Sequence, residues 1–492
     1  MPRPLLSAVA FALASVPARA QGHEWSRFRG PSGAGLAPAG ARLPAALDPE
    51  KNLRWKSELP PGNSSPCLTA ERVFVTGCRE GELQTVCLDR ADGSLLWTRV
   101  VKPSALEKTH EINSPASPTP ASDGRNVISY FGSFGLVAHD LEGQELWRRE
   151  LPPAKNTFGT AASPVMAGGQ LIFVCDTEES SFLEALEPAT GKTLWRKERA
   201  GFKSGWSTPG LWSRDDEPGE QREELLVLGV GWLTAYDLAG GERWSFPGLT
   251  DEPITTPIAG NGLVYATSYN LKTNADAMLL WSYEKVLAEH DHDGDGAIDA
   301  AELAENASVL SRPDADGEGD HPLAIFQRFL DVDKDSRITA AEYAKLRAWV
   351  DSWEHLNGIV ALRPGTDERP AELAWHHPRG VPECPSPVLA GGRLYMVMNG
   401  GTLTCLDAHS GALVFEARLA ARGPYYASLV AGDGKLYAAS ARGELTVFAA
   451  AAKLEVLSTL DLDERLMATP ALADGCVFVR TESRLRAFGL ER

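Results

Sequence analysis

Two acidic stretches of twelve residues, Asp291–Glu302 and Asp331–Glu342, contain the side chains best suited to chemistry in this sequence. Each places an oxygen-bearing side chain at positions 1, 3, 5, 9 and 12, and a β-branched residue at position 8. Ca²⁺ takes six to eight oxygen ligands, and a loop of this length can supply them and close the shell with a bidentate Glu. The spacing therefore predicts two calcium sites.

The predicted ligands share one layout, that of an EF-hand loop. They are Asp291, Asp293, Asp295, the carbonyl of Ala297, Asp299 and Glu302 in the first loop, and Asp331, Asp333, Asp335, the carbonyl of Arg337, Thr339 and Glu342 in the second. Position 6 requires a positive φ, and it is Gly296 in the first loop but Ser336 in the second. A left-handed non-glycine residue costs about 1–2 kcal/mol, so we predict that the second site binds Ca²⁺ more weakly.

Apolar residues flank both loops at helical spacing. They are Leu279, Tyr283, Val286 and Leu287 before the first loop, Leu323, Phe326, Phe329 and Leu330 before the second, and Tyr343, Leu346, Trp349, Val350 and Trp353 after it. Ile298 and Ile338 occupy the same position in their loops and are predicted to pair. Two other interpretations stay open: an acidic surface loop that binds nothing, and sites whose Ca²⁺ only stabilises the fold, which we favour over signalling.

The first twenty residues have the features of a secretory signal peptide. Arg3 supplies a positive charge, Leu5 to Val16 form a short apolar run, and Ala18-Arg19-Ala20 precede the expected cleavage point. The apolar run is too short to span a bilayer, and no later segment reaches the required length. We therefore expect an exported protein, periplasmic or extracellular, without a membrane span.

The formal net charge is −18, and much of it belongs to the segment around the acidic loops. Residues 284–354 hold eighteen Asp and Glu against seven Lys and Arg. This charge argues against nucleic acid or an anionic membrane as a partner. The seven cysteines are dispersed; we expect Cys87 and Cys405 in the core, whereas Cys67 and Cys78 could form a disulfide.

A repeated unit organises the sequence outside residues 272–357. Each unit begins with Ser/Thr-Pro or a similar step, continues through short apolar strands, and ends with a Gly turn and an aromatic strand. The starts are Ser65-Pro66, Ser117-Pro118, Ser163-Pro164, Thr208-Pro209, Thr256-Pro257, Ser386-Pro387, Ser428-Leu429 and Thr469-Pro470. They are about 41–52 residues apart, except for one gap of 130 that contains the acidic loops. Units of this length are typical of propeller blades, and the count predicts eight.

The predicted fold is all-β: an eight-bladed β-propeller of four-stranded antiparallel blades, with a small all-α EF-hand pair inserted in blade five. The last unit lacks a fourth strand, and residues 53–59 offer one that would close the ring. After the signal peptide, residues 1–20, we divide the chain into residues 21–271 with the first blades, 272–357 with the insertion, and 358–492 with the rest. A stacked array of β-sandwiches is the alternative.

The unit endings resemble those of the PQQ-binding-like β-propeller repeat family, also called quinoprotein-alcohol-dehydrogenase-like. They include LDRADGSLLW, HDLEGQELW and LEPATGKTLW, and the resemblance covers nearly all of the expected mature chain outside the insertion. It implies that a glycine makes the outer turn and a tryptophan packs between blades, roles that fall to Asp89, Gly93 and Trp97, to Asp140, Gly143 and Trp147, and to Gly191 with Trp195. The segment WSRFRGPSGAG, Trp25–Gly35, resembles the start of exported bacterial members.

This resemblance does not decide the function. The dehydrogenases of the class share an adjacent Cys-Cys pair near the cofactor, which this sequence lacks, and no catalytic Asp with calcium-holding Glu and Asn can be assigned. Other relatives, such as the outer-membrane assembly lipoprotein, are scaffolds without a cofactor. We therefore predict an exported calcium-binding propeller that is a non-catalytic binding or scaffold protein, with EF-hand sites that order the insertion. The alternatives are a PQQ-dependent oxidoreductase and a calcium-regulated protein-interaction module.

Residues just before the inner strands are expected to rim a central funnel. This set includes Lys108, His110, Asn113, Lys203, Trp206, Asp251, Tyr425, Tyr426 and Arg465. Mixed charge with aromatic rings would suit a polar small molecule, a sugar or a protein segment as ligand, and ordinary polar loops are the simpler interpretation. His110-Glu111 and His376-His377 lack a third ligand at a recognisable spacing, so we expect loop or outer-strand residues there rather than a transition-metal site.

Overall fold

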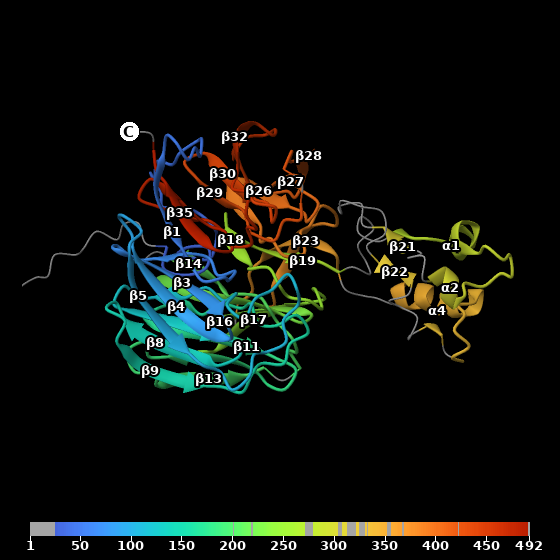
Figure 1. Ribbon diagram of the computed structural model, residues 1–492, viewed down its shortest axis with the longest axis horizontal. Helices are drawn as coiled ribbons and strands as arrows, with labels where there is room; N and C mark the ends of the chain where they lie inside the picture. The colour runs from blue at the N-terminus through green and yellow to red at the C-terminus, as the bar shows by residue number, and fades with distance from the viewer. Residues whose placement is uncertain are drawn as a thin grey trace, which may run out of the picture.

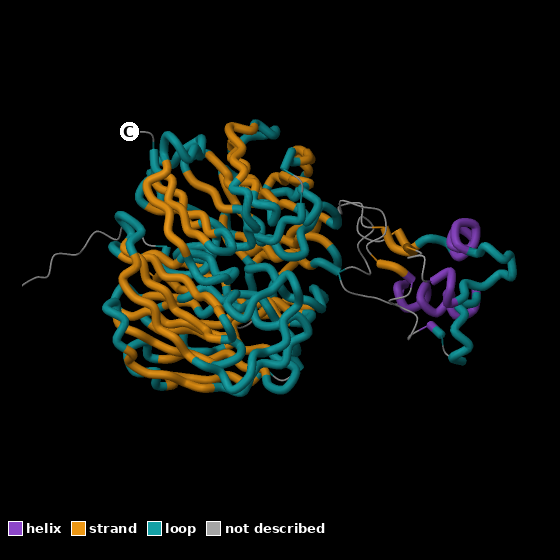
Figure 2. The backbone as a smooth tube through the Cα atoms, in the orientation of Figure 1, coloured by secondary structure: helices purple, strands orange, loops and turns teal. Residues whose placement is uncertain are grey.

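The computed structural model describes residues 25–199, 201–217, 220–270, 279–303, 308–311, 321–323, 330–331, 333–351, 356–366, 369–421 and 423–490. The predicted signal peptide, residues 1–20, lies outside these residues. No helix among them is long and apolar enough to cross a membrane. Figures 1 and 2 show a large body of sheets and, beside it, a small unit that contains the helices.

Eight antiparallel sheets of four strands form the propeller, as predicted. Blade one contains β2 (Cys67–Leu68), β3 (Arg72–Arg79), β4 (Glu82–Asp89) and β5 (Leu95–Val101), and blade two contains β6 (Ala121–Ser122), β7 (Asn126–Phe131), β8 (Gly135–Asp140) and β9 (Glu145–Glu150). Blade three contains β10 (Val165–Ala167), β11 (Gln170–Asp176), β12 (Ser181–Leu186) and β13 (Thr193–Glu198), and blade four contains β14 (Gly210–Glu217), β15 (Glu220–Gly229), β16 (Trp232–Asp237) and β17 (Glu242–Pro247). Blade five contains β18 (Ile258–Gly260), β19 (Leu263–Ser268), β23 (Gly358–Arg363) and β24 (Glu372–His377), and blade six contains β25 (Val388–Ala390), β26 (Arg393–Val397), β27 (Thr402–Asp407) and β28 (Leu413–Arg418). Blade seven contains β29 (Val430–Gly432), β30 (Lys435–Ala439), β31 (Glu444–Ala449) and β32 (Val456–Asp461), and blade eight contains β33 (Ala471–Ala473), β34 (Cys476–Arg480), β35 (Arg484–Phe488) and β1 (Leu53–Glu58).

The middle strands of each blade consist mainly of apolar residues, because neighbouring blades cover both of their faces. In β11 and β12, for example, all residues except the first of each strand are buried. The outer strand of the same blade, β13, is mostly exposed and carries charged side chains. His376 and His377 lie in β24, an outer strand, as expected.

A tryptophan and a glycine close each of five seams between blades. Trp97 Nε1 donates to the carbonyl of Leu141 at 2.9 Å, and its ring lies on Gly143 of the next blade. The same arrangement joins Trp147 to Gly191, Trp195 to Gly240, Trp375 to Gly411, and Trp55 to Gly93. Since β1 pairs with β35, Trp55 makes this contact between the last blade and the first.

A ring of hydroxyl side chains surrounds the central axis where the inner strands begin. Its eight members, which we call the hydroxyl ring, are Ser65, Thr119, Ser163, Thr208, Thr256, Ser386, Ser428 and Thr469. The backbone N–H of seven members donates to the hydroxyl oxygen of the next at 2.9–3.0 Å; the Thr208–Thr256 step lacks this bond. The second unit therefore starts at Thr119-Pro120 rather than at Ser117-Pro118.

The residues Trp25–Leu36 cross the central channel, and we call this segment the axial plug. Its contacts with inner strands are Trp25–Leu68, Ser26–Ser122, Arg29–Pro387, Ser32–Leu211 and Leu36–Ala431. Four of these partners, all but Pro387, stand three residues after the hydroxyl-ring member of their own blade. The plug thus lies one level beyond the ring and connects blades that are far apart in the sequence.

The insertion leaves blade five between its second and third strands, since β19 pairs directly with β23. It contains α1 (Tyr283–His290), α2 (Ala300–Leu303) and α4 (Ala340–Asp351), but it is not all-α. A three-stranded sheet is formed by β20 (Leu279–Leu280), β21 (Ser308–Ser311) and β22 (His321–Pro322). Leu279, predicted in a helix, pairs with Ser311 instead, because α1 starts only after its cap at Ser282.

The chain returns to the propeller at Leu356 and Asn357. The N–H of Leu356 donates to the carbonyl of Gly248 at 2.8 Å, and Nδ2 of Asn357 donates to that of Pro378 at 2.9 Å. Cys87 and Cys405 are buried as expected, and none of the seven cysteines takes part in a disulfide.

Candidate functional site

The first acidic loop joins α1 to α2 and turns its carboxylates inward. Ligand oxygens of Asp291, Asp293 and Glu302 lie within 4.8 Å of one another. The N–H groups of Gly294 and Gly296 donate to the two oxygens of Asp291 at 2.8 and 3.0 Å. Glu302 is only 6% exposed. Carboxylates this close repel one another unless a cation lies between them.

Asp295 and Asp299, two further predicted ligands, are placed differently. Asp295 forms an ion pair with the side chain of Arg337 in the second loop, and this contact raises the pKa of the guanidinium. Asp299 Oδ1 accepts the N–H groups of Ala301 and Glu302 at 2.8 and 3.0 Å, at the start of α2. Three of the five predicted carboxylates in this loop therefore converge, and a fourth, that of Asp295, is paired with the Arg337 guanidinium.

The second loop brings together Asp331, Asp333 and Asp335, again within 4.8 Å. Ser336 has φ +65°, and its N–H donates to Asp331 Oδ2 at 3.1 Å, whereas Oδ1 of Asp331 is buried without a hydrogen-bond partner. Glu342 is not one of these three, and its Oε2 accepts both the N–H and the hydroxyl of Thr339, at 3.0 and 2.9 Å.

The two loops lie back to back through the predicted Ile298–Ile338 pair. Each isoleucine donates its N–H to the carbonyl of the other, at 3.1 and 2.9 Å, and both side chains are fully buried. The apolar core beneath them contains Val286, Leu323, Leu330, Tyr343 and Leu346. Phe326, Phe329 and Trp353 lie outside the described residues, as do the side chains of Trp349 and Val350. Ala297 is buried at 4% exposure, next to this core.

A cavity of about 580 Å³ lies at the mouth of the propeller, and we call it the funnel. His110, Asn113, Trp206 and Tyr426 of the predicted set line it. Lys108, Lys203, Asp251 and Arg465 do not, and Tyr425 is fully buried beside it. Phe28 of the axial plug is also part of the lining, so the plug closes the far end of the funnel.

One wall of the funnel is aromatic and fixed by hydrogen bonds. The ring of Phe158 lies 5.2 Å from that of Trp206 and 5.6 Å from that of His110, between centroids. Trp206 Nε1 donates to the carbonyl of Gly159 at 2.7 Å, and Asn113 Nδ2 donates to that of Phe158 at 2.8 Å. Such a wall can bind the flat or apolar face of a ligand.

Sequence reasoning missed several lining residues, among them Phe158, Glu383 and Asn399. Phe158 and Glu383 precede inner strands, like the residues that were predicted, so the same rule could have found them. Asn399 lies in the turn between β26 and β27, where no sequence signal marks it. Its Nδ2 donates to Glu383 at 2.9 Å.

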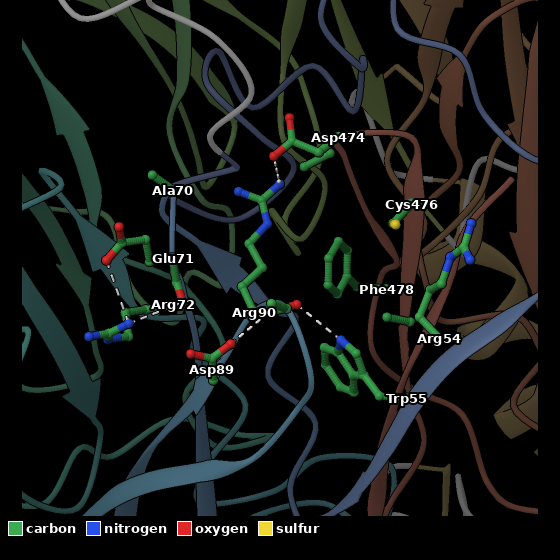
Figure 3. A pocket seen from close by; sticks show the side chains of 13 residues that line it. Arg54, Trp55, Ala70, Glu71, Arg72, Asp89, Arg90, Asp474, Cys476 and Phe478 are labelled. Atoms are coloured by element: carbon green, nitrogen blue, oxygen red, sulfur yellow. Dashed lines mark hydrogen bonds and ion pairs between the residues drawn. The ribbon is translucent and has the colours of Figure 1, made fainter.

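A second cavity, of about 440 Å³, lies in the seam between the last blade and the first (Figure 3). Arg90 extends into it from the turn after β4 and forms an ion pair with Asp474 at 2.7 Å. The corresponding position in blades two and four is apolar, Leu141 and Leu238. The cavity contains three arginines and three acidic residues, so its charges balance, and we interpret it as part of the ring closure.

Comparisons with known proteins agree with this fold. Residues 36–182 match the family described as outer membrane protein assembly factor BamB. No curated protein matches the chain in sequence. The structure of BamB from Moraxella catarrhalis is similar with a TM-score of 0.50 and 10% identity, over 88% of this chain and 97% of that one.

Quinohemoprotein alcohol dehydrogenase from Comamonas testosteroni is similar with a TM-score of 0.52 and 11% identity, over 95% of this chain and 81% of that one. The computationally designed protein Ika8 gives 0.51 and 12%, over 89% and 99%. At these identities the structures establish the fold and not the activity. Together with the repeated seams and the family match over residues 36–182, this fold is consistent with a PQQ-like β-propeller repeat family.

Proposed function

We propose that this protein is an exported calcium-binding propeller that works as a non-catalytic binding or scaffold protein. The observation that carries the proposal is the pair of acidic loops, each with three converging carboxylates, joined back to back by Ile298 and Ile338. Two EF-hand loops that share a short β-bridge form one calcium-binding unit.

Each loop is one rearrangement away from a fuller set of ligands. In the first, Ca²⁺ would take Asp295 from Arg337, exchanging a weak exposed ion pair for a divalent cation. In the second, Oδ1 of Asp331 lacks a partner, and Glu342 needs to turn from Thr339 to the ion. The remaining proposed ligands are the carbonyls of Ala297 and Arg337, with Asp299 and Thr339.

The proposed role of the ions is to hold the insertion folded. Its apolar core is small, and both loops place repelling carboxylates next to it. A ligand that binds only the folded form stabilises it in proportion to the logarithm of its concentration. Export to a calcium-rich compartment would keep even modest sites filled, so order rather than signalling is the expected consequence.

The funnel is the proposed binding site of the propeller. It is a closed-ended cavity with one aromatic wall, and its volume lies within the range of pockets for small molecules. A small molecule, a sugar or a protein segment is the proposed partner. The likeness to BamB, an outer membrane protein assembly factor by description, supports a partner that is a protein.

The funnel does not suit PQQ, the cofactor that the fold suggests. PQQ carries three carboxylate groups and therefore needs positively charged contacts. The described lining contains Glu111, Glu252 and Glu383, and neither lysine nor arginine. Three further carboxylates facing PQQ would repel it, which favours the non-catalytic function over a PQQ-dependent oxidoreductase.

Calorimetric titration with Ca²⁺ tests the calcium sites one at a time. The wild-type protein is expected to bind two ions, and the variants Glu302→Gln and Glu342→Gln one each. Glu289→Gln is the matched control, because Glu289 is an exposed acid on α1 outside both loops. Absence of binding in the wild-type protein, or two sites in all three variants, would refute the proposal.

A further inference from the structure

Five buried nitrogen atoms without a hydrogen-bond partner lie within five consecutive residues of the axial plug. They are Nε1 of Trp25, Nη1 and Nη2 of Arg27, and Nε and Nη1 of Arg29. The three residues are 0%, 1% and 0% exposed. All five atoms are hydrogen-bond donors, and a buried donor without an acceptor destabilises the folded state, more so when it is charged. The plug therefore needs acceptors that its own surroundings do not supply.

The charge of the two arginines is also unbalanced. Their remaining hydrogen bonds go to neutral carbonyls: Arg27 Nε to Gly30 at 3.2 Å, and Arg29 Nη2 to Ala34 at 3.2 Å and to Pro387 at 2.5 Å. Burial lowers the pKa of Arg27 to about 10, partly offset by Glu223, and that of Arg29 to about 9. No carboxylate in the described residues forms an ion pair with either guanidinium.

Two other buried arginines of the propeller have the hydrogen-bond partners at their terminal nitrogens that Arg27 lacks. Arg199 donates to both carboxylate oxygens of Asp176 and to the hydroxyl of Tyr236. Arg480 directs Nη1 and Nη2 to the carbonyls of Ser64 and Pro60, at 2.9 and 3.3 Å. Both side chains have partners for Nη1 and Nη2, although Nε of Arg480 has none, whereas neither Nη1 nor Nη2 of Arg27 has a hydrogen-bond partner.

We propose that the axial plug encloses a small inorganic anion, a halide or a tetrahedral oxyanion such as sulfate or phosphate, held by Arg27 and Arg29. The Nη1 and Nη2 atoms of Arg27 form the parallel pair of donors that binds two oxygens of an oxyanion. The anion neutralises charge at the ring axis, where it fastens the plug to the inner strands. Phe28, between the two arginines, faces the funnel, so the anion lies behind the funnel floor and is separate from the funnel ligand.

A crystal of the full-length mature protein soaked in sodium bromide gives the first test. The expected result is an anomalous peak within hydrogen-bond distance of the Arg27 or Arg29 guanidinium. Before soaking, the same position is expected to hold an anion from the purification buffer. Density for ordered water alone, or a Glu223 carboxylate seated on Arg27, would overturn the proposal.

The second test compares thermal unfolding in increasing sodium sulfate or bromide at constant ionic strength, adjusted with the salt of a bulky organic anion. The midpoint of the wild-type protein is expected to rise with the logarithm of the small anion's concentration. This slope should be smaller in Arg27→Met and Arg29→Met than in the wild-type protein, and unchanged in Arg480→Met, the control at a buried guanidinium whose Nη1 and Nη2 both have carbonyl partners. Equal slopes in all proteins would refute the proposal; if the plug variants do not fold, the wild-type bromide crystal decides.

Discussion

Single residues set the chemistry of the acidic loops, and the sequence was informative here because EF-hand spacing fixes which atoms can converge. The positive φ of Ser336 follows from its position in the loop. The ion pair between Asp295 and Arg337 could not be predicted, since it depends on how the two loops face each other. The same holds for the guanidinium nitrogens of Arg27 and Arg29 that lack a hydrogen-bond partner, since both residues look like ordinary polar residues in the sequence.

Replacing Ser336 with glycine is predicted to strengthen Ca²⁺ binding at the proposed second site. Its φ of +65° is strained for serine and free of strain for glycine. Relief of about 1–2 kcal/mol corresponds to roughly a tenfold gain in affinity. Titration of Ser336→Gly in the Glu302→Gln background isolates this site, and an unchanged or lower affinity would show that the turn is not strained.

Glu107 is predicted to make stability depend on pH. Burial raises the pKa of its carboxyl to about 7, although Thr160 donates two hydrogen bonds to it, from its N–H at 3.0 Å and its hydroxyl at 2.8 Å. The folded-state pKa lies above the unfolded value of about 4.3. The folded state therefore gains stability below pH 4, and this gain is lost as the pH rises to 7.

Chemical unfolding at pH 5 and pH 8 measures the effect. The free energy of unfolding of the wild-type protein should fall by up to about 3 kcal/mol over this range through this group. Glu107→Gln, which cannot ionise, should flatten the profile, and the exposed control Glu150→Gln should leave it unchanged. A steep profile in Glu107→Gln would assign the dependence to other groups.

At the scale of elements, the repeat predicted the blades because strand, turn and tryptophan recur with little change. The start of blade two was misplaced by two residues since the sequence Ser117-Pro118-Thr119-Pro120 contains two equivalent steps, and only Thr119 joins the hydroxyl ring. Leu279 was misassigned because an apolar residue one turn before a helix has the same spacing as one inside it. Pairing with β21 places it in β20 instead.

The seams between blades can be tested with two glycines of equal backbone conformation. Gly143 and Gly81 both have φ +82°, but a Cβ on Gly143 would lie 2.7 Å from Cδ2 of Trp97, whereas nothing lies within 4 Å of one on Gly81. Both alanine variants carry the backbone strain of about 1–2 kcal/mol. Gly143→Ala is predicted to lower the free energy of unfolding by about 1–3 kcal/mol more than Gly81→Ala does, because its added methyl group overpacks the seam. If denaturant unfolding gave the same decrease in free energy for both variants, the Trp97 side chain would have moved aside without cost.

At the scale of the whole molecule, the sequence predicted eight blades from the repeat and offered residues 53–59 to close the ring. It did not predict the axial plug, since Trp25–Leu36 has no periodic pattern and contacts strands that are distant in the sequence. The funnel was predicted only in part for the same reason: its lining comes from loops of several blades, whose side-chain directions depend on the closed ring.

The insertion is predicted to be dispensable for the propeller. Ser268 pairs with Gly358 across the point of insertion, and Leu356 with Asn357 bonds to the propeller. Replacing residues 272–355 with a short Gly/Ser linker should keep a cooperative thermal transition and abolish Ca²⁺ binding at both proposed sites. Loss of the β-sheet signal in circular dichroism would show that the blades depend on the insertion.

The central claim is that the two acidic loops bind Ca²⁺, and a crystal structure grown in millimolar CaCl₂ tests it most directly. One anomalous difference peak is expected in each loop, with Asp291, Asp293 and Glu302 around the first and Asp331, Asp333 and Asp335 around the second. Asp295 should then have moved from Arg337 to the ion. Ordered loops without a peak at either position would contradict the claim.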